Sequence, residues 1–560
     1  MIRTLLLIIC LSTLTAKAAV NYNKAFDAVR STKAVSALFN NAVDQGTTNE
    51  LHTALESHIA SSTFSNSQIQ TKIQALFDIY FLLELTQNQD LDKHFLKWLA
   101  DYKRLSYFLY SIDTKDKIDK ALNILQQLYL HDTKNAPKFF KLMIAMSLVW
   151  DQPRLKLHHQ MGKNILSYEE HITERYDYFK QIYTRGAKIN YSRLSIQDLI
   201  FVVDTPLPLS ELLWARKNVR SSLSKWGNLY PEIVYDKKRL ERKQYQWLYG
   251  TYTMEQIKKV GGICVDQAYY TVIAARAFGI PAIFLHGRGR NAGEMHAWCG
   301  YMQSPGKWNM EVGRYEEMKF VTGWTKDPQS NLTITDHTLD FKCNKDLSGA
   351  NSFKSKRLTA IAQFYKKNHK EKHFLTAVQT AISSQPLNIQ PWDALGNYYQ
   401  QKKLIKPLVA LLKKKMTVFK KYPDFVLHIG QNAVKILREN GLDRDADRLE
   451  GTISRGIKKR EDLTETHVKD NIAKLYKSGK AEEGRKAFET YLKKQEELYD
   501  QLENDLTEYL KYTKEHKQTK KAVSFMRRII KGKREKNFMH FLAEAYRNDG
   551  DEKRAERVMK

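Results

Sequence analysis

Apolar residues recur every three or four positions over most of the chain. Ile118, Leu122 and Leu125 illustrate this spacing, which places such residues on one face of a helix. Turn signals separate apolar segments of about 12 to 20 residues. We therefore predict that residues 19–195 form an all-helical domain, and no pattern in that region points to chemistry.

Helical spacing returns after residue 345. Three segments there share a loose pattern of small, aromatic and glycine positions, at 392–398, 472–487 and 542–555. The last two begin about 70 residues apart, roughly twice a 34-residue helix-turn-helix unit. They resemble tetratricopeptide repeats without meeting the full pattern, and a plain array of helical hairpins remains the alternative. We predict that residues 346–560 form a helical-repeat domain that serves as a scaffold or docks a protein partner.

The central residues 196–345 have a different pattern. Apolar runs at 281–287, 294–302 and 307–312 have the length and the bounding turn residues of β-strands. The short connection at 303–306 predicts a hairpin between the last two. The predicted fold class is therefore α+β, with a mixed central domain flanked by helical N-terminal and helical-repeat C-terminal domains.

The start of the central domain is less regular. Leu199–Val203 is a short β-branched run that ends at Asp204-Thr205-Pro206, and a helix is expected from Glu211 to Leu223. The aromatic, charged sequence that follows contains Tyr230 and Trp247. We interpret these aromatics as core residues, with a substrate groove as the alternative.

The first 18 residues have the pattern of a signal peptide. Arg3 precedes a short apolar run, and Ala16-Lys17-Ala18 offers a small-x-small cleavage site. The run is too short to span a bilayer, and no later segment has the pattern of a membrane helix. We therefore expect an exported protein, periplasmic or secreted, that is cleaved near Ala18.

The composition is that of a folded protein with a strongly basic surface. Only 12 prolines and 25 glycines in 560 residues argue against long disordered tracts, but the formal net charge is +29. The basic residues alternate with acids at helical spacing, and no aromatic-interleaved recognition motif accompanies them. This favours a solvated basic face over specific nucleic-acid binding. Attraction to an anionic envelope polymer or to acidic substrates remains open.

Three cysteines remain after the predicted cleavage: Cys264, Cys299 and Cys343. An odd number in an oxidising compartment suggests one bridge and one free thiol, and a Cys299–Cys343 bridge would spare Cys264. Unpaired buried cysteines are the equally weighted alternative.

Cys264 begins a predicted helix. Two glycines precede it, and the apolar positions that follow keep helical spacing as far as Gly279 and Pro281. Free N–H groups and the helix dipole at such a start favour a thiolate, which predicts a lowered pKa for the Cys264 thiol. A buried structural cysteine is the simpler interpretation when this helix is taken alone.

A histidine and an acid follow in an order that suits a thiol enzyme. On the second predicted strand, alternation puts His296 and Trp298 on one face and Cys299 on the other, which argues against Cys299 as the nucleophile. On the third strand Asn309 and Glu311 share a face, so either could reach the histidine across the hairpin and fix its tautomer.

At these residues the sequence resembles the transglutaminase-like superfamily, a papain-related thiol fold. The resemblance covers about 60 residues, and its points are Gly262-x-Cys264 opening a helix, Arg276–Ala282 closing it, His296-Ala297-Trp298 on a strand, and Trp308 shortly before an acid. It implies Cys264 as nucleophile, His296 as general base and acid, and an acyl-enzyme intermediate. The family usually has Asp as third member. Here we favour Glu311, with Asn309 as the alternative.

Further site predictions concern the substrate, metals and cofactors. Trp298 beside the histidine and Arg288 in a basic, glycine-rich loop are predicted substrate contacts, and a plain loop is the alternative for the latter. Cys264, His286 and His296 lack the paired spacing of zinc ligands, and no calcium-binding loop is present. We predict no metal and no cofactor.

Two functions are compatible with these patterns. The first is an exported cysteine protease, amidase or transglutaminase acting on protein or peptide amides, with hydrolysis slightly favoured over transfer to an amine. The second is a non-catalytic cell-envelope scaffold or peptide-binding protein. An intact Cys264 and His296 pair favours the first, and the missing aspartate favours the second.

Overall fold

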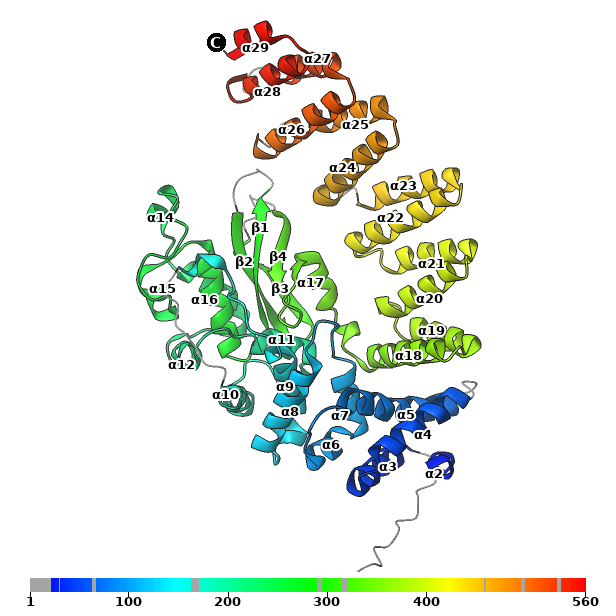
Figure 1. The fold of residues 1–560 in the computed structure, drawn as a ribbon. Helices are drawn as coiled ribbons and strands as arrows, with labels where there is room; N and C mark the ends of the chain where they lie inside the picture. The colour runs from blue at the N-terminus through cyan, green and yellow to red at the C-terminus, as the bar shows by residue number, and fades with distance from the viewer. Residues whose placement is uncertain are drawn as a thin grey trace, which may run out of the picture. The chain divides into compact units, whose positions relative to one another are not determined.

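The computed structural model describes residues 22–29, 31–62, 67–162, 171–289, 295–314, 320–457, 460–494, 499–530 and 535–559 (Figure 1). The predicted signal peptide lies outside these residues. The chain divides into two compact units. The first comprises residues 1–112, 117–140 and 350–394, and the second comprises residues 113–116, 141–349 and 395–560.

The first unit is helical throughout its described part, as expected for the N-terminal region. Its helices are α2 (Tyr22–Ala28), α3 (Thr32–Gln45), α4 (Thr48–Ser61), α5 (Ser67–Thr86), α6 (Lys93–Leu99), α7 (Tyr102–Leu109), α8 (Ile118–His131), α18 (Ala350–Lys367) and α19 (Glu371–Ser384). The last two come from the region that the sequence pattern assigned to the repeat domain. Two more helices, α9 (Ala136–Trp150) and α20 (Ile389–Gln401), cross the divisions between the units.

Helix α18 is held to α5 by a buried ion pair. Arg357 donates from Nε and Nη2 to the two carboxylate oxygens of Asp78, at 2.8 and 2.7 Å. The Tyr110 hydroxyl donates to the same carboxylate at 2.6 Å, and Phe364 packs edge-on against Tyr80. The Asp78 and Arg357 side chains are only 1% and 6% exposed. Charges in such a position are stable only while paired, so this contact fixes residues 350–394 to the N-terminal helices.

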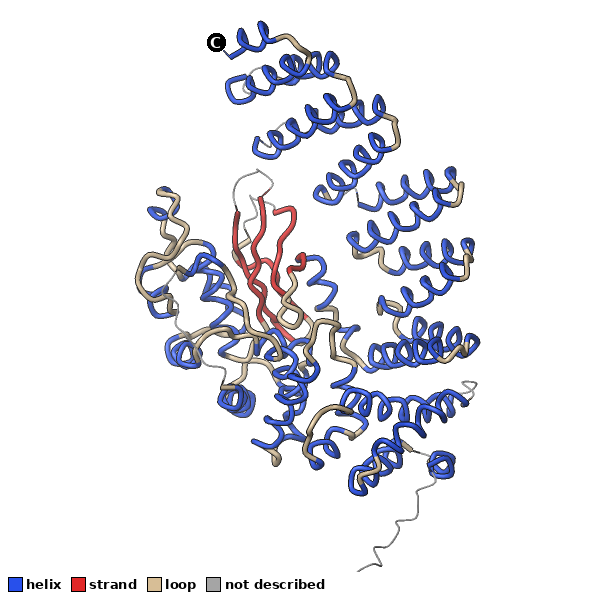
Figure 2. The backbone as a smooth tube through the Cα atoms, viewed as in Figure 1, coloured by secondary structure: helices blue, strands red, loops and turns tan. Residues whose placement is uncertain are grey.

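The second unit contains one antiparallel sheet. The sheet is drawn in red in Figure 2. Its strands are β1 (Ala282–Gly289), β2 (Met295–Ser304), β3 (Lys307–Val312), β4 (Phe320–Lys326) and β5 (Thr333–Thr335), in the order β3-β2-β1-β4-β5. The first three confirm the strands expected from the sequence, including the hairpin between β2 and β3. β4 and β5 were not anticipated.

The two faces of this sheet are covered by different helices. Helix α16 (Cys264–Ala277) packs on β1 and β2, where the Cys299 thiol hydrogen-bonds to Thr271 of that helix. On the opposite face Trp298 packs against Phe201 and Leu339. The alternation expected for β2 is therefore confirmed, since Trp298 and Cys299 point to opposite faces.

Further helices surround the sheet within this unit. They are α10 (Ile172–Arg185), α11 (Ile196–Val203), α12 (Leu209–Asn218), α13 (Leu229–Glu232), α14 (Lys237–Glu241), α15 (Met254–Val260) and α17 (Asp336–Lys342). The β-branched run at 199–203 belongs to α11, because Ser195 and Asp198 form a capping box that starts a helix there. Helix α12 starts and ends earlier than the expected Glu211–Leu223.

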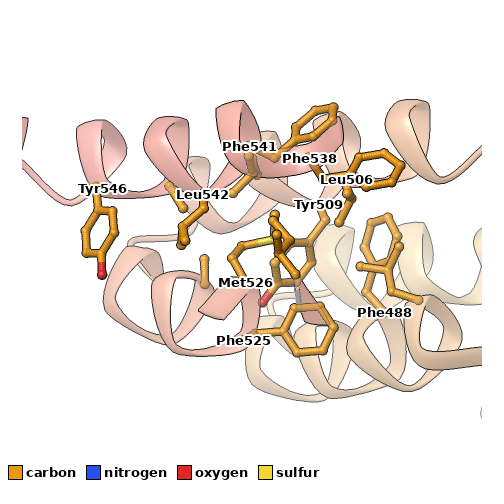
Figure 3. Packing of buried hydrophobic residues seen from close by; sticks show 14 of the residues in the cluster. Phe488, Leu506, Tyr509, Phe525, Met526, Phe538, Phe541, Leu542 and Tyr546 are labelled. Atoms are coloured by element: carbon orange, nitrogen blue, oxygen red, sulfur yellow. The ribbon is translucent and has the colours of Figure 1, made fainter. Parts of the chain in front are cut away.

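The chain after residue 404 forms helices that pack on their neighbours in sequence. They are α21 (Ile405–Val418), α22 (Pro423–Glu439), α23 (Asp443–Ile457), α24 (Glu461–Lys477), α25 (Ala481–Lys494), α26 (Tyr499–Glu515), α27 (Thr519–Ile529), α28 (Glu535–Asn548) and α29 (Glu552–Met559). Figure 3 shows that Phe488, Tyr509, Phe525 and Phe541, from helices α25 to α28, pack in one hydrophobic core. The helical part of the prediction is confirmed, and the tetratricopeptide resemblance stays a prediction.

No helix in the described ranges is both long and apolar enough to traverse a lipid bilayer. The compartment of the protein stays a prediction from residues 1–18.

Candidate active site

Two glycines set the entry to the helix that carries Cys264. Gly261 has a φ of +85°, and a Cβ there would lie 2.4 Å from the carbonyl oxygen of Val234. A Cβ on Gly262 would lie 2.4 Å from Cβ of Asp266. Neither position therefore tolerates a side chain without movement of the backbone, and the chain turns tightly into α16 with Cys264 as its first residue.

Asp266 provides the cap of this helix. The residue before Cys264 is Ile263, which has no side-chain acceptor, and the Asp266 carboxylate instead accepts the Ile263 N–H at 2.9 Å. An acid in the first turn also interacts favourably with the helix dipole. The first turn of α16 is thus fixed by a side chain from within that turn.

The Cys264 thiol is almost fully buried, at 8% exposure. The main-chain N–H groups of Ala297, Val265 and Cys264 itself approach the sulfur and favour the thiolate. Burial is the larger effect and raises the pKa of the thiol, and the negative charge of Asp266 acts in the same direction. The prediction that the helix start lowers this pKa is therefore wrong, because desolvation outweighs the N–H groups.

His296 lies near the start of β2 with a defined tautomer. Its ring is stacked at 18° to that of Trp298, on the same face of the strand. Its Nε2 lies 2.6 Å from the carbonyl oxygen of Gly313. A carbonyl only accepts, so Nε2 carries the proton, and in the neutral ring Nδ1 is the basic nitrogen.

The Cys264 thiol lies at the edge of β2, beside the residue that follows His296. Ala297 follows His296, and β3 ends at Val312, which pairs with Cys299 rather than reaching Ala297. The N–H of Ala297 is directed to the Cys264 sulfur, and its carbonyl accepts the Tyr230 hydroxyl at 2.7 Å. The edge left open by β3 is therefore occupied by the thiol and by Tyr230. The predicted nucleophile thus lies beside the strand residue next to the predicted base, and their pairing stays a prediction.

The two predicted orienting residues have other partners. The Glu311 carboxylate is 62% exposed and pairs with Arg314 at 3.0 Å. The Asn309 side-chain oxygen accepts the backbone N–H of Glu311 at 3.0 Å. β3 contains one extra residue between Asn309 and Val312 relative to β2, and this bulge breaks the alternation on which the prediction rested. The Nε2 partner given above is Gly313, so an orienting role for Glu311 or Asn309 stays a prediction.

The Glu311→Gln variant distinguishes a surface ion pair with Arg314 from a catalytic role in orienting His296. Because the Glu311 carboxylate is mostly exposed and paired with Arg314, we expect the variant to change the rate of Cys264 alkylation less than about twofold. A triad acid would instead cost roughly four orders of magnitude in turnover when replaced by its amide. The measurement is the rate of iodoacetamide labelling at Cys264, followed by peptide mapping from pH 5 to 9. A large loss in the rate of Cys264 alkylation in Glu311→Gln would instead support Glu311 as the third catalytic residue.

The structure describes the side chain of only one of the two predicted substrate contacts, Trp298 and Arg288. Trp298 is fully buried in the cluster with Phe201 and Leu339, which assigns its ring to the core. The backbone of Arg288 pairs with Met295 in the sheet, but its side chain lies outside the described residues.

All three cysteines are free. Cys343 packs with the Trp298 cluster, whereas Cys299 faces α16 on the other side of the sheet. A Cys299–Cys343 bridge would have to pass through the sheet, so the unpaired alternative is the one observed.

Sequence reasoning missed three residues that contact the candidate site. Gly313 acts through a main-chain carbonyl, which leaves no side-chain signal. Tyr230 was assigned to the core without a partner. Asp266 has the spacing of a capping-box acid, but the N-cap is Ile263 rather than Ser or Thr, so the pattern is concealed.

Comparison with known families identifies the kind of domain that holds these residues. Residues 224–310 match the family model of the transglutaminase-like superfamily, and this range contains Cys264 and His296 and ends before Glu311. No curated protein matches the chain. The matched range also includes α16 and the hairpin partner β2, so the chain carries a transglutaminase-like domain in its centre.

Proposed function

We propose that the protein is an exported cysteine enzyme that acts on protein or peptide amides through a thioester at Cys264. The observation that supports the proposal is that the Cys264 sulfur lies against the N–H of Ala297, the residue after His296, while Nε2 of His296 is held by the Gly313 carbonyl. A transglutaminase-like domain is typically a cysteine-based enzyme fold, which supports the same reaction class.

In this mechanism His296 Nδ1 accepts the thiol proton as the sulfur attacks the amide carbonyl carbon. The tetrahedral intermediate collapses by breaking the C–N bond, and the imidazolium returns the proton to the leaving amine. Water or a second amine then attacks the thioester and regenerates the thiol. The N–H groups at the start of α16 lie beside the sulfur, where they can stabilise the developing oxyanion.

The raised pKa of Cys264 determines whether its thiol is protonated before substrate binds. Burial keeps the sulfur protonated at neutral pH. We infer that Cys264 rests as a thiol, and that transfer of its proton to His296 accompanies attack on the substrate. Hydrolysis is favoured over transfer to an amine only by the sequence resemblance, and the helical repeats are proposed to dock the protein substrate or a partner.

Alkylation of Cys264 tests the proposal. We expect iodoacetamide to label Cys264 faster than the buried Cys299, with a rate that falls by roughly 10- to 100-fold near pH 7 in His296→Ala, because the base is lost and the apparent thiol pKa rises. Peptide mapping reads the cysteines separately. Cys264→Ser is expected to abolish any amidase or transamidase activity on a casein substrate.

Two outcomes would favour the non-catalytic scaffold. One is labelling of Cys264 no faster than that of Cys299 and no change in His296→Ala. The other is activity that survives in Cys264→Ser. The raised pKa of the thiol and the exposed position of Glu311 are the observations that keep this second function in view.

A further inference from the structure

A buried ion pair lies directly behind the first turn of α16. Nη1 of Arg239 donates to the Asp266 carboxylate at 2.6 Å, and the two side chains are 1% and 0% exposed. Arg239 comes from α14, a short helix separate in sequence from the catalytic helix. Two opposite charges are thus held in the interior two residues from Cys264.

Arg239 also organises the segment that follows it. Nε donates to the carbonyl of Gln244 at 2.9 Å and Nη2 to the carbonyl of Tyr245 at 2.5 Å, while the guanidinium lies over the ring of Trp247 at 5.6 Å. The side chain therefore uses donors on all three of its nitrogens. This is the geometry of a fixed positioning group rather than of a surface cation.

The hydrogen bonds continue beyond the ion pair. The Tyr252 hydroxyl donates to the second carboxylate oxygen of Asp266 at 3.0 Å. His158 lies 2.9 Å from the same hydroxyl, which has already used its proton, so Nε2 of His158 is the donor. Burial lowers the pKa of His158 to about 3, so its ring is neutral. Each carboxylate oxygen of Asp266 is therefore satisfied, by Arg239 and Ile263 on one side and by Tyr252 on the other.

We propose that Arg239, Asp266, Tyr252 and His158 form a positioning unit that fixes the first turn of α16 and balances the charge felt by the Cys264 sulfur. The inference rests on the proposed role of Cys264 as nucleophile. Asp266 supplies the cap that holds the turn, and its negative charge opposes ionisation of the thiol. Arg239 offsets that charge and, through its carbonyl contacts, holds the adjoining segment against the helix.

Other titratable groups face these residues and are left in place by the test. Cys264 is flanked by Tyr230 from α13, whose hydroxyl approaches the Cys264 carbonyl, and His296 of β2 precedes Ala297, whose N–H approaches the sulfur. His158 is faced by His159 and by His286 of β1. Since the variants described next do not touch any of these, a shift in the titration of Cys264 reports on Asp266 or Arg239.

Two substitutions in the ion pair are expected to act in opposite directions. Asp266→Asn removes the negative charge nearest the sulfur and keeps the guanidinium, so the apparent thiol pKa falls and alkylation of Cys264 at pH 7.5 speeds up several-fold. Arg239→Met leaves an unbalanced carboxylate, so the thiol pKa rises and alkylation slows, by about tenfold for each pKa unit. The double variant returns towards the wild-type profile. The measurement is the pH profile of iodoacetamide labelling at Cys264 by peptide mapping.

Loss of stability alone cannot give this pattern, because both single variants destabilise the same buried pair. Controls come from the other end of α16, where Arg276 contacts Asp204 at 3.0 Å with both side chains buried and Arg154 is a second partner of Asp204 at 2.8 Å. Asp204→Asn and Arg276→Met are expected to destabilise the protein without shifting the Cys264 profile. If Arg239→Met does not fold, Arg239→Lys keeps the charge and is expected to leave the profile in place, while Asp266→Asn alone still has to lower the pKa.

Shifts of Asp266→Asn and Arg239→Met in the same direction, or an unshifted Asp266→Asn profile, would overturn the inference. That result is distinct from failure of the proposed function. The latter shows as labelling of Cys264 that His296→Ala leaves unchanged, whatever the two ion-pair variants do.

Discussion

The Arg357→Met variant is expected to lose about 3–5 kcal/mol of folding free energy in the first unit, because it leaves the Asp78 carboxylate buried without its cation. Asp78 would retain only the hydroxyl donors of Tyr110 and Ser106. The measurement is hydrogen exchange of α5 and α18, which reports on this unit separately from the rest of the chain.

An exposed ion pair supplies the control. Arg438 contacts Asp447 at 2.9 Å and Glu450 at 3.0 Å, but its side chain is 42% exposed. Arg438→Met is therefore expected to cost no more than about 1 kcal/mol. If Arg357→Met has an equally small effect on exchange in α5, the buried pair does not hold α18 to the N-terminal helices.

Gly313→Ala is expected to give the largest loss of activity among variants outside Cys264 and His296. Gly313 has a φ of +84°, and a Cβ there would lie 2.4 Å from the ring of Tyr230. The backbone must move, so its carbonyl leaves Nε2 of His296 and the ring loses its tautomer and orientation. We expect a loss of alkylation rate and turnover of about 100-fold, as a displacement of about 1 Å in a catalytic group produces, together with roughly 1–3 kcal/mol of destabilisation from strain.

A substitution at Gly250 is the control that distinguishes the effect of backbone strain from that of moving the Gly313 carbonyl. It has a φ of +78°, and nothing lies within 4 Å of the position its Cβ would take. Gly250→Ala is therefore expected to cost about 1 kcal/mol while leaving alkylation of Cys264 unchanged. Equal activity losses in Gly313→Ala and Gly250→Ala would mean that the Gly313 carbonyl does not position His296.

The parts of the site that could be predicted depend on local patterns. The helix that begins at Cys264 follows from the glycines before it and from Gly279 and Pro281 after it. The strand of His296 follows from alternation, which also placed Cys299 on the wrong face for a nucleophile. Each of these signals lies within a few residues of the feature it predicts.

The parts that could not be predicted depend on the fold. One extra residue in β3 moves Glu311 out of alternation, and a bulge of this kind has no reliable sequence signal. The direction of the thiol pKa depends on burial, which the position of Cys264 in its helix does not reveal. The carbonyl of Gly313 is a backbone group, available at any residue, so only the three-dimensional structure singles it out.

The pairing of Asp78 with Arg357 has a consequence for synthesis on the ribosome. The partners are 279 residues apart, so at about 5–20 residues per second the carboxylate waits roughly 15–55 s for its cation. During that interval the N-terminal helices expose Phe77 and Tyr80, which later pack on Phe364. Helix α5 is thus synthesised well before the helix that completes its core, and a chaperone that shields α5 would act in that interval.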